Sequence, residues 1–432
     1  MTDVRWRWRA LVKELSQPLG RLEFLLRQYS RLEPVLFLFA RLYRRHLLKR
    51  TRVIAVVGSL GKSTTARCIW AALGGDDRKL SQRNAGSFIA RAMLRARPWH
   101  RHVVIEVGIR QTGQMAAYAR LVQPDITVVT CIASEHNRSL KTLETTRDEK
   151  AEMIRIMSAD GLAVLNGDDP NVRWMADQTR ANVCFFGFSE KNAFRADRFR
   201  IDWPVGSRMR LQAPPGIFQM RVRFIGRQMA YATLAAAAVA FHENVPPEVA
   251  LARLAMLPPT AGRMQAIPLP NGAVILRDDY KATLETIYSA LDAVSEIPGR
   301  RILVLGSVSE PPGKQLTVYR NLCQRIAGIA SRVVLVTSRK TLQMYKSSLR
   351  KAGYPMTSVH TVRQRQGERK SLHHAVELIR RDFGPGDVIL IKGRSDQRFE
   401  RIAFELMGQT VRCDVDRCDV EAVNCEHCPR LW

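Results

Sequence analysis

The chain has 432 residues, of which 46% are hydrophobic and 25% are charged, a composition typical of a globular protein with room for two or three domains. Lysine and arginine number 68 against 40 acidic residues, and the net charge of +28 favours acidic partners: nucleic acid, anionic lipid or a polyanionic substrate. No apolar run reaches the roughly 18 to 20 residues of a transmembrane helix. No motif that reads DNA or RNA accompanies the charge, so nucleic acid is the least favoured partner.

The first fifty residues combine tryptophan and leucine with many arginines in a basic amphipathic pattern. Two interpretations of residues 1–50 stay open. Such helices can lie on an anionic membrane surface, or they can pack on the following domain with a solvated basic face.

A glycine-rich loop follows the apolar run 53–57 and reads Gly58-Ser-Leu-Gly-Lys-Ser-Thr64. Its glycines let the backbone turn tightly and direct N–H groups at phosphate oxygens. Its lysine adds positive charge, its serine can ligate Mg²⁺, and a helix expected after it directs its positive end at the same place. We therefore predict that a nucleotide triphosphate binds at Gly58, Gly61, Lys62, Ser63 and Thr64.

The organisation of the chain predicts an α/β protein. Short apolar runs alternate with helical segments over residues 51–264, which predicts a central P-loop domain with a mostly parallel sheet. Residues 190–227 alternate polar and apolar side chains and predict a β excursion inside it. A second, Rossmann-like α/β domain is expected at 265–410, and a cysteine-rich tail at 411–432.

Polar residues beyond two strands of the central domain are candidate metal ligands. Glu106 ends one apolar run, His136 lies just past the next, and Lys150 lies in a helix after it. Ligands of parallel sheets bind at the carboxyl ends of strands. Ser63, Glu106 and His136 could therefore hold Mg²⁺, although a single Glu or His is more often structural.

The order of nine short motifs between residues 51 and 407 resembles the Mur ligase family, the ATP-dependent amide ligases of cell-wall precursor synthesis. The likeness is greatest to the branch that adds D-alanyl-D-alanine to a UDP-muramoyl peptide. The motifs are Gly58–Thr64, Glu106–Gly108, Glu135–His136, Lys150–Ile154, Asn166–Pro170, Gly262–Arg263, Asp278–Ala282, Leu305–Glu310 and Pro385–Ser395.

The resemblance implies a reaction and a set of residue roles. ATP would phosphorylate a substrate carboxylate, and an amine would displace the phosphate to form an amide. The implied partners are an acidic carboxylate acceptor and an amino-acid or other amine donor. Lys150 matches a family lysine that is often carbamylated. The implied catalytic residues are Lys62, Lys150, Arg263 and Lys392, with nucleotide contacts at Asn166 and Asp278 and Mg²⁺ at Ser63, Glu106 and His136.

Departures from the family pattern concern substrates more than chemistry. The basic residues 1–50 do not resemble the family's uridine-binding domain. Gln228-Met229 stands where the family has His-Asn beside adenine, Lys281 replaces an Asn, and Ser307 replaces an Asp. These departures predict altered base recognition. They also predict an acceptor other than UDP-muramoyl peptide: a polymeric or lipid-linked anion, such as a poly-γ-glutamate-like chain or an acidic glycan.

Four cysteines crowd the tail: Cys413, Cys418, Cys425 and Cys428. The Cys425–Cys428 spacing is common in zinc sites, whereas the other gaps are unusual. One interpretation is a structural Zn²⁺. The other is free thiols or a regulatory redox pair.

Two other functions stay open. The chain could be a basic P-loop NTPase or nucleic-acid-binding protein without ligase activity, although Glu106, His136 and Lys150 argue against this. It could also be a ligase subunit that requires a protein partner. We expect a cytoplasmic protein, since no signal peptide is evident and a nucleotide is bound, peripheral at the inner membrane face if the basic segment binds lipid.

Overall fold

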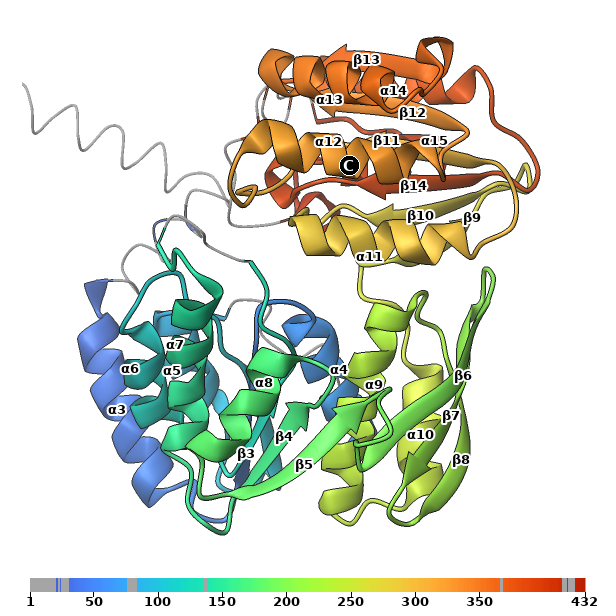
Figure 1. The fold of residues 1–432 in the computed structure, drawn as a ribbon. Helices are drawn as coiled ribbons and strands as arrows, with labels where there is room; N and C mark the ends of the chain where they lie inside the picture. Colours follow the sequence, from blue (N-terminus) through green and yellow to red (C-terminus); the bar gives the residue numbers. More distant parts are fainter. Residues whose placement is uncertain are drawn as a thin grey trace, which may run out of the picture.

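The computed structural model describes residues 21, 24, 31–75, 84–134, 139–365, 368–413, 418 and 424–431. Two sheets dominate it and lie in separate parts of the molecule (Figure 1). Each sheet is parallel through most of its width and ends in antiparallel pairing at one edge. The predicted α/β fold, with a mostly parallel P-loop domain and a second α/β domain, is confirmed.

The first sheet has eight strands in the order β2-β1-β3-β4-β5-β6-β7-β8. β1–β6 pair in parallel, and β6, β7 and β8 form an antiparallel meander that confirms the predicted β excursion. The strands are β1 Arg52–Val57, β2 His102–Glu106, β3 Ile126–Val129, β4 Leu162–Asn166, β5 Asn182–Gly187, β6 Phe194–Asp202, β7 Gly206–Ala213 and β8 Gly216–Val222.

Helices cover both faces of this sheet, and β1 shows why. Ile54 and Val56 point into one apolar cluster, whereas Val53, Ala55 and Val57 point into another, so an uninterrupted apolar strand is buried on both sides. α4 Lys62–Ala72, α9 Arg227–His242 and α10 Pro247–Met256 cover the first face. α3 Glu33–His46, α5 Ser87–Arg95, α6 Gln114–Val122, α7 Leu143–Arg155 and the short α8 Pro170–Trp174 lie on the second.

The second sheet has six strands in the order β13-β12-β11-β14-β10-β9. Its strands are β9 Gln265–Pro268, β10 Val274–Asp278, β11 Arg301–Leu305, β12 Arg332–Thr337, β13 Val359–Arg363 and β14 Val388–Lys392. One face carries α11 Leu284–Ser295, α12 Gln315–Ala327 and α13 Arg339–Lys351, and the other carries α14 Arg369–Arg380 and α15 Glu400–Leu406. Because β9 begins at Gln265, we retain 51–264 and 265–410 as the proposed domain limits.

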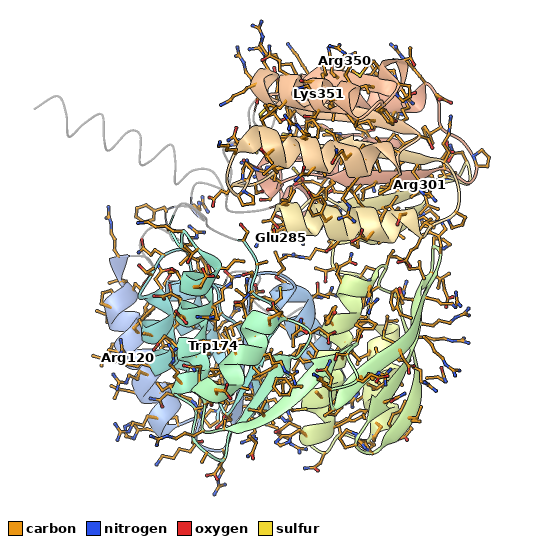
Figure 2. The ribbon with its side chains drawn as sticks, viewed as in Figure 1. Arg120, Trp174, Glu285, Arg301, Arg350 and Lys351 are labelled. Carbon is orange, nitrogen blue, oxygen red and sulfur yellow. The ribbon has the colours of Figure 1, made fainter. Side chains whose placement is uncertain are left out.

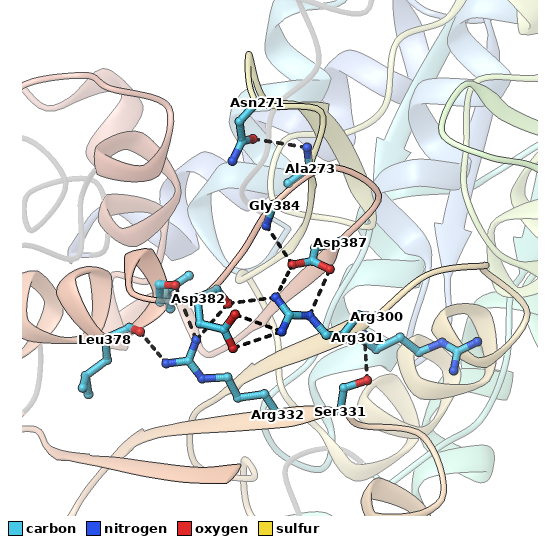
Figure 3. A network of polar contacts seen from close by, with 11 residues as sticks. Asn271, Ala273, Arg300, Arg301, Ser331, Arg332, Leu378, Asp382, Gly384 and Asp387 are labelled. Carbon is cyan, nitrogen blue, oxygen red and sulfur yellow. Dashed lines mark hydrogen bonds and ion pairs between the residues drawn. The ribbon is translucent and has the colours of Figure 1, made fainter.

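A polar network closes the amino-terminal edge of the second sheet (Figure 3). The Arg300 guanidinium donates to Asp387 at 2.7 Å and to Asp382 at 3.0 Å, and Arg332 donates to the Asp382 carbonyl at 3.1 Å. The network fixes the ends of strands that are far apart in the sequence. At the opposite, carboxyl edge of the same sheet, Asp278 and Lys392 line a cavity together with residues of the first domain.

The described helices include none that is long and apolar enough to cross a bilayer. Residues 1–20, 22–23 and 25–30, on which most of the N-terminal amphipathic prediction rests, lie outside the described part of the chain. α3, which is described, packs on the first domain beside α5 and α6.

Candidate active site

The glycine-rich loop turns between β1 and α4, as its sequence predicts. Gly61 has φ 81° and Gly58 has φ 136°, a region that favours glycine. A Cβ on Gly58 would lie 2.0 Å from the Thr130 hydroxyl oxygen at the end of β3. Any side chain there would force the loop away from the sheet, so this glycine is required by space as well as by backbone angle.

The loop has the features of a phosphate cradle. Among the described residues no side chain caps the first turn of α4, so its N–H groups point out of the helix end without an internal acceptor. The Lys62 ammonium is buried and donates to the carbonyls of Gly58 at 2.9 Å and Ser59 at 3.1 Å. An ammonium and a helix end that converge on one loop make a site for a multiply charged anion.

Lys150 reaches this loop from α7. Its Nζ donates to the Ser59 hydroxyl at 2.8 Å, and the same hydroxyl accepts from the Ala133 N–H at 2.9 Å. Lys150 is buried, so the serine joins the phosphate loop, the helix and the β3 loop in one polar cluster. The structure thus brings Lys150 to the loop, while its carbamylation stays a prediction.

The predicted magnesium ligands are only partly described. Glu106 ends β2 beside Val56 of β1, is buried, and accepts from the Asn84 amide at 2.6 Å. The Ser63 hydroxyl lies 3.4 Å from an Arg263 nitrogen. His136 lies outside the described residues. Within the described part of the chain, no three His, Cys, Asp or Glu side chains gather in a metal-binding cluster, so the magnesium set stays a prediction.

A cavity of about 280 Å³ opens beside the loop. Asn166 lines it and donates from its amide to the Thr130 carbonyl at 2.8 Å, while Gln228 and Met229 line it from the start of α9. These two residues occupy the position where the sequence departs from the family pattern. The cavity therefore joins the phosphate loop to the part of the site whose specificity we expect to differ.

Asp168 forms a rigid part of the same cavity. Its carboxylate accepts from the Phe188 and Ser189 N–H groups, the Asn192 amide and the Tyr231 hydroxyl. Burial raises the pKa of this carboxyl, but the four donors outweigh it and hold the pKa below its usual value. The result is an ionised aspartate that fixes the β5 end and α9 relative to each other.

The second domain contributes a buried ion pair to the cavity. The Lys392 ammonium at the end of β14 donates to Asp278 of β10 at 2.6 Å and to the Lys281 carbonyl at 2.7 Å. Burial lowers the pKa of Lys392, and the Asp278 carboxylate opposes that shift. The parallel pairing of β10 and β14 places both residues at the carboxyl edge of the sheet.

Side-chain contacts also join the domain boundary and the second domain to the first domain. Arg263 lies over the Tyr280 ring at 4.4 Å and reaches Ser63, and the Lys281 ammonium lies 3.4 Å from the Ser59 carbonyl. Glu285, labelled between the two domains in Figure 2, accepts from the Ser134 N–H at 3.2 Å. Its other carboxylate oxygen is buried and has no hydrogen-bond partner in the described part of the chain.

Sequence reasoning missed three of these residues as parts of the site. Lys281 had a signal, since it replaces a family asparagine, and Asp168 lies within a matched motif. Glu285 had none, because one acid in the first turn of a helix is common. Among the predicted residues, the described cleft brings together Gly58, Gly61, Lys62, Ser63, Thr64, Lys150, Asn166, Arg263, Asp278 and Lys392.

Cysteines of the tail pack against α15 of the second domain. Arg401 is buried and donates to the sulfurs of Cys425 at 3.2 Å and Cys413 at 3.5 Å. Burial raises the pKa of the Cys425 thiol to about 12. All four tail cysteines are free and described, and they do not form a metal-binding cluster. The zinc interpretation therefore has no geometric support, and the tail packs as part of the second domain.

Two family models match the chain. The Mur ligase middle domain matches residues 56–240, and the Mur ligase, glutamate ligase domain matches residues 262–395. The UDP-N-acetylmuramoyl-tripeptide–D-alanyl-D-alanine ligase of Escherichia coli is 27% identical over 264 residues, which are 60% of this chain and 58% of that protein. The match thus spans less than two thirds of that relative's length.

Solved structures share the fold. MurF from Acinetobacter baumannii aligns with a TM-score of 0.75 and 20% identity over 87% of this chain and 81% of that one. The folylpolyglutamate synthase of Mycobacterium tuberculosis, solved with ADP and AMPPCP, aligns with a TM-score of 0.65 and 16% identity over 93% of this chain and 99% of that one.

Proposed function

The chain belongs to the Mur ligase family, and we propose that it is an ATP-dependent ligase that joins a carboxylate to an amine through an acyl phosphate. One observation carries the proposal. Lys392 of the second domain lines one cavity with Gly61 and Thr64 of the phosphate loop. Lys62 and Lys150 of the first domain hydrogen-bond to Ser59 of the same loop. A site that must bring a nucleotide phosphate to a carboxylate needs cations on both sides, because the two reactants repel each other.

The phosphate loop fits ATP. Three features suit the β- and γ-phosphates: the tight turn that requires glycine at position 58, the uncapped amino end of α4 and the Lys62 ammonium. Ser63 and Glu106 would hold Mg²⁺, because hydroxyl and carboxylate oxygens are the ligands it prefers, and His136 stays the third predicted ligand. When bound, Mg²⁺ would supply charge neutralisation at the phosphates.

The reaction divides between the two walls of the cleft. An oxygen of the acceptor carboxylate attacks the γ-phosphorus, ADP leaves, and an acyl phosphate forms. The amine nitrogen then attacks the acyl carbon, phosphate leaves with its oxygen, and the nitrogen loses a proton. Lys62, the α4 amides and Arg263, which reaches Ser63, stabilise charge on the phosphates, while Lys392 stabilises it from the second domain. The buried walls exclude water, which would otherwise hydrolyse the acyl phosphate.

An arginine row supports an acidic acceptor. β6, β7 and β8 place Arg200 opposite Arg208 and Arg208 opposite Arg221, and all three are exposed. Like charges directly opposite on neighbouring strands destabilise a sheet. Asp202 pairs with Arg208 at 3.4 Å, and a bound polyanion would compensate the charge that remains. We therefore propose a polymeric or lipid-linked anion, such as a poly-γ-glutamate-like chain or an acidic glycan, as the acceptor.

The amine donor is proposed only as a class. The family implies an amino acid, and the name of folylpolyglutamate synthase, whose fold aligns along nearly its whole length, indicates a glutamate-chain product. Glutamate is therefore the first donor to test. D-Alanyl-D-alanine is the second, because the E. coli relative is named as its ligase.

A matrix of donors and acidic acceptors tests the proposal through phosphate release from ATP. We expect release to require one donor and one acceptor together. Phosphate release at the same rate without donor and acceptor would contradict ligase activity and favour a simple NTPase.

The arginine row needs a separate test with a matched control. We expect R200Q/R208Q/R221Q to raise KM for the acceptor about tenfold or more and to leave KM for ATP unchanged. The KM for the acceptor should also depend less on salt concentration in this variant. The control R339Q/R350Q/K351Q removes three exposed charges from α13, where Figure 2 labels Arg350 and Lys351. An equal effect in the control would show that only net charge matters.

A further inference from the structure

Helix α3 is held firmly on the first domain through its inner face. Phe37 packs edge-on against Tyr118 of α6 with ring centroids 5.9 Å apart. The Tyr43 hydroxyl donates to the Ala96 carbonyl at 2.8 Å, and Arg44 pairs with Asp125 at 2.9 Å. These contacts leave the opposite face of the helix turned away from the domain.

That opposite face is apolar and exposed. Five large apolar side chains, each between 45% and 59% exposed, lie on it: Leu32, Val35, Leu38, Phe39 and Leu42. Their three- and four-residue spacing places them in one stripe along the helix. With Leu47, residues 32–47 hold six of the fifteen exposed large hydrophobic residues among those described. A concentration of this kind on a globular protein marks an interaction surface.

The exposed charges that the structure describes around the stripe are of one sign. Arg31, Arg41, Arg45, Lys49 and Arg50 are exposed beside it. The one acid of the helix, Glu33, is turned inward and accepts from the Ser87 N–H at 3.1 Å.

The neighbouring helices extend this charge pattern. α5 and α6 contain arginine and no acid, and Figure 2 shows Arg120 of α6 on this side of the molecule. Trp99, which follows α5, is 79% exposed. Its loop pairs with the end of the α3–β1 connection through the bond from the Arg52 N–H to the Arg101 carbonyl.

We propose that this surface, the outer face of α3 with its basic flanks and Trp99, binds an anionic lipid bilayer, with α3 lying in the plane of the interface. The apolar stripe would enter the boundary between headgroups and acyl chains, and the arginines would meet lipid phosphates. An indole suits the same depth, since its ring is apolar and its N–H polar.

Charge complementarity selects the bilayer over two other occupants. A second copy of this surface would bring two sets of arginines together. Residues 1–30 of the same chain are also rich in arginine and would add repulsion. An anionic surface is the occupant that matches both the stripe and its flanks.

The proposal is independent of the ligase chemistry and consistent with it. α3 lies on the side of the first domain remote from the second domain (Figure 1), so a bilayer there leaves the cleft between the domains open. β10 and β14, which end in Asp278 and Lys392, lie in the second domain, away from α3 in Figure 1.

Vesicle flotation of the full chain tests the inference. We expect binding to vesicles of phosphatidylglycerol and phosphatidylcholine, much weaker binding to phosphatidylcholine alone, and loss of binding in high salt. The variant L38Q/F39Q/L42Q should weaken binding at least about tenfold, since it removes three apolar side chains that would enter the bilayer. Circular dichroism and ATP binding of this variant should match those of the parent, because its changes are at the surface.

A matched control distinguishes binding through this surface from non-specific hydrophobic binding to vesicles. V249Q/M256Q/L316Q removes three exposed apolar side chains from α10 and α12 and should bind vesicles like the parent. Equal loss in this control, equal binding to uncharged vesicles, or no binding by the parent would overturn the proposal. A parent dimer that L38Q/F39Q/L42Q dissociates, without vesicle binding, would overturn it in favour of a second copy.

Discussion

The two walls of the cleft differ in how far apart in the sequence their residues lie. The first-domain wall, which we propose to bind phosphate, consists of a turn, a helix end and one lysine, all within residues 58–64. The second-domain wall depends on side chains far apart in the sequence, such as Lys392 and Asp278, which are 114 residues apart. A compact wall keeps its chemistry when its surroundings change, whereas a composite wall needs an intact sheet and a closed cleft. The two should therefore respond differently to mutation.

Removal of Lys62 should have the largest effect on activity. We expect K62A to lower kcat/KM for ATP roughly 100- to 1000-fold, because a charge at the transferred phosphate is lost. The unfolding free energy should change little, since the loop carbonyls can be solvated. Steady-state kinetics and urea unfolding measure both, with K346A on the exposed face of α13 as control. Activity of K62A near that of the parent would show that the phosphate loop does not take part in the reaction.

Lys392 should affect stability as well as activity. K392M leaves Asp278 buried without its partner and should lower the unfolding free energy by about 3 kcal/mol or more. The double variant K392M/D278N removes both charges and should recover most of that stability, yet stay inactive. Urea unfolding measures the stability of both variants, and phosphate release measures their activity. Activity that returns with stability would reduce the pair to a structural role.

Glu285 should show how much the contact between the walls matters. We expect E285A to lower kcat about tenfold, because the acceptor for the Ser134 N–H is lost. E285Q keeps an acceptor oxygen and should retain most of the activity. A rate for E285Q as low as that for E285A would show that the carboxylate charge, rather than the contact, is required.

Asp168 should give the smallest effect, on stability and its pH dependence. The folded pKa of this carboxyl is lowered, so its stabilisation is present above the unfolded pKa and disappears as the pH falls through the folded value. We expect D168N to lower the unfolding free energy by about 1 to 3 kcal/mol at neutral pH. The difference in unfolding free energy between D168N and the parent should become smaller as the pH is lowered to 3, which is below the ordinary aspartate pKa of about 3.9. A difference that stays constant between these pH values would mean that the carboxylate charge is not what the donors stabilise.

Much of the fold could be predicted because its signals are local. Uninterrupted apolar strands, helical spacing and the loop at 58–64 each lie within a few residues, and the polar–apolar alternation of β6 and β8 marked the meander. Glu285 and Asn84 could not be placed, since their partners are 151 and 22 residues away and depend on the packing of elements. The apolar residues of α3 could not be divided into an inner and an outer face, because both faces are apolar. The four tail cysteines suggested zinc by spacing, but their arrangement around Arg401 follows from the docking of the tail on α15.

Isotope transfer tests the central claim of acyl-phosphate chemistry most directly. The acceptor carboxylate found in the substrate screen is labelled with ¹⁸O, and the released phosphate is analysed by mass spectrometry. We predict one ¹⁸O atom in each phosphate formed with amide, because the carboxylate oxygen leaves with the phosphorus. Phosphate without the label, released at the rate of amide formation, would contradict the mechanism.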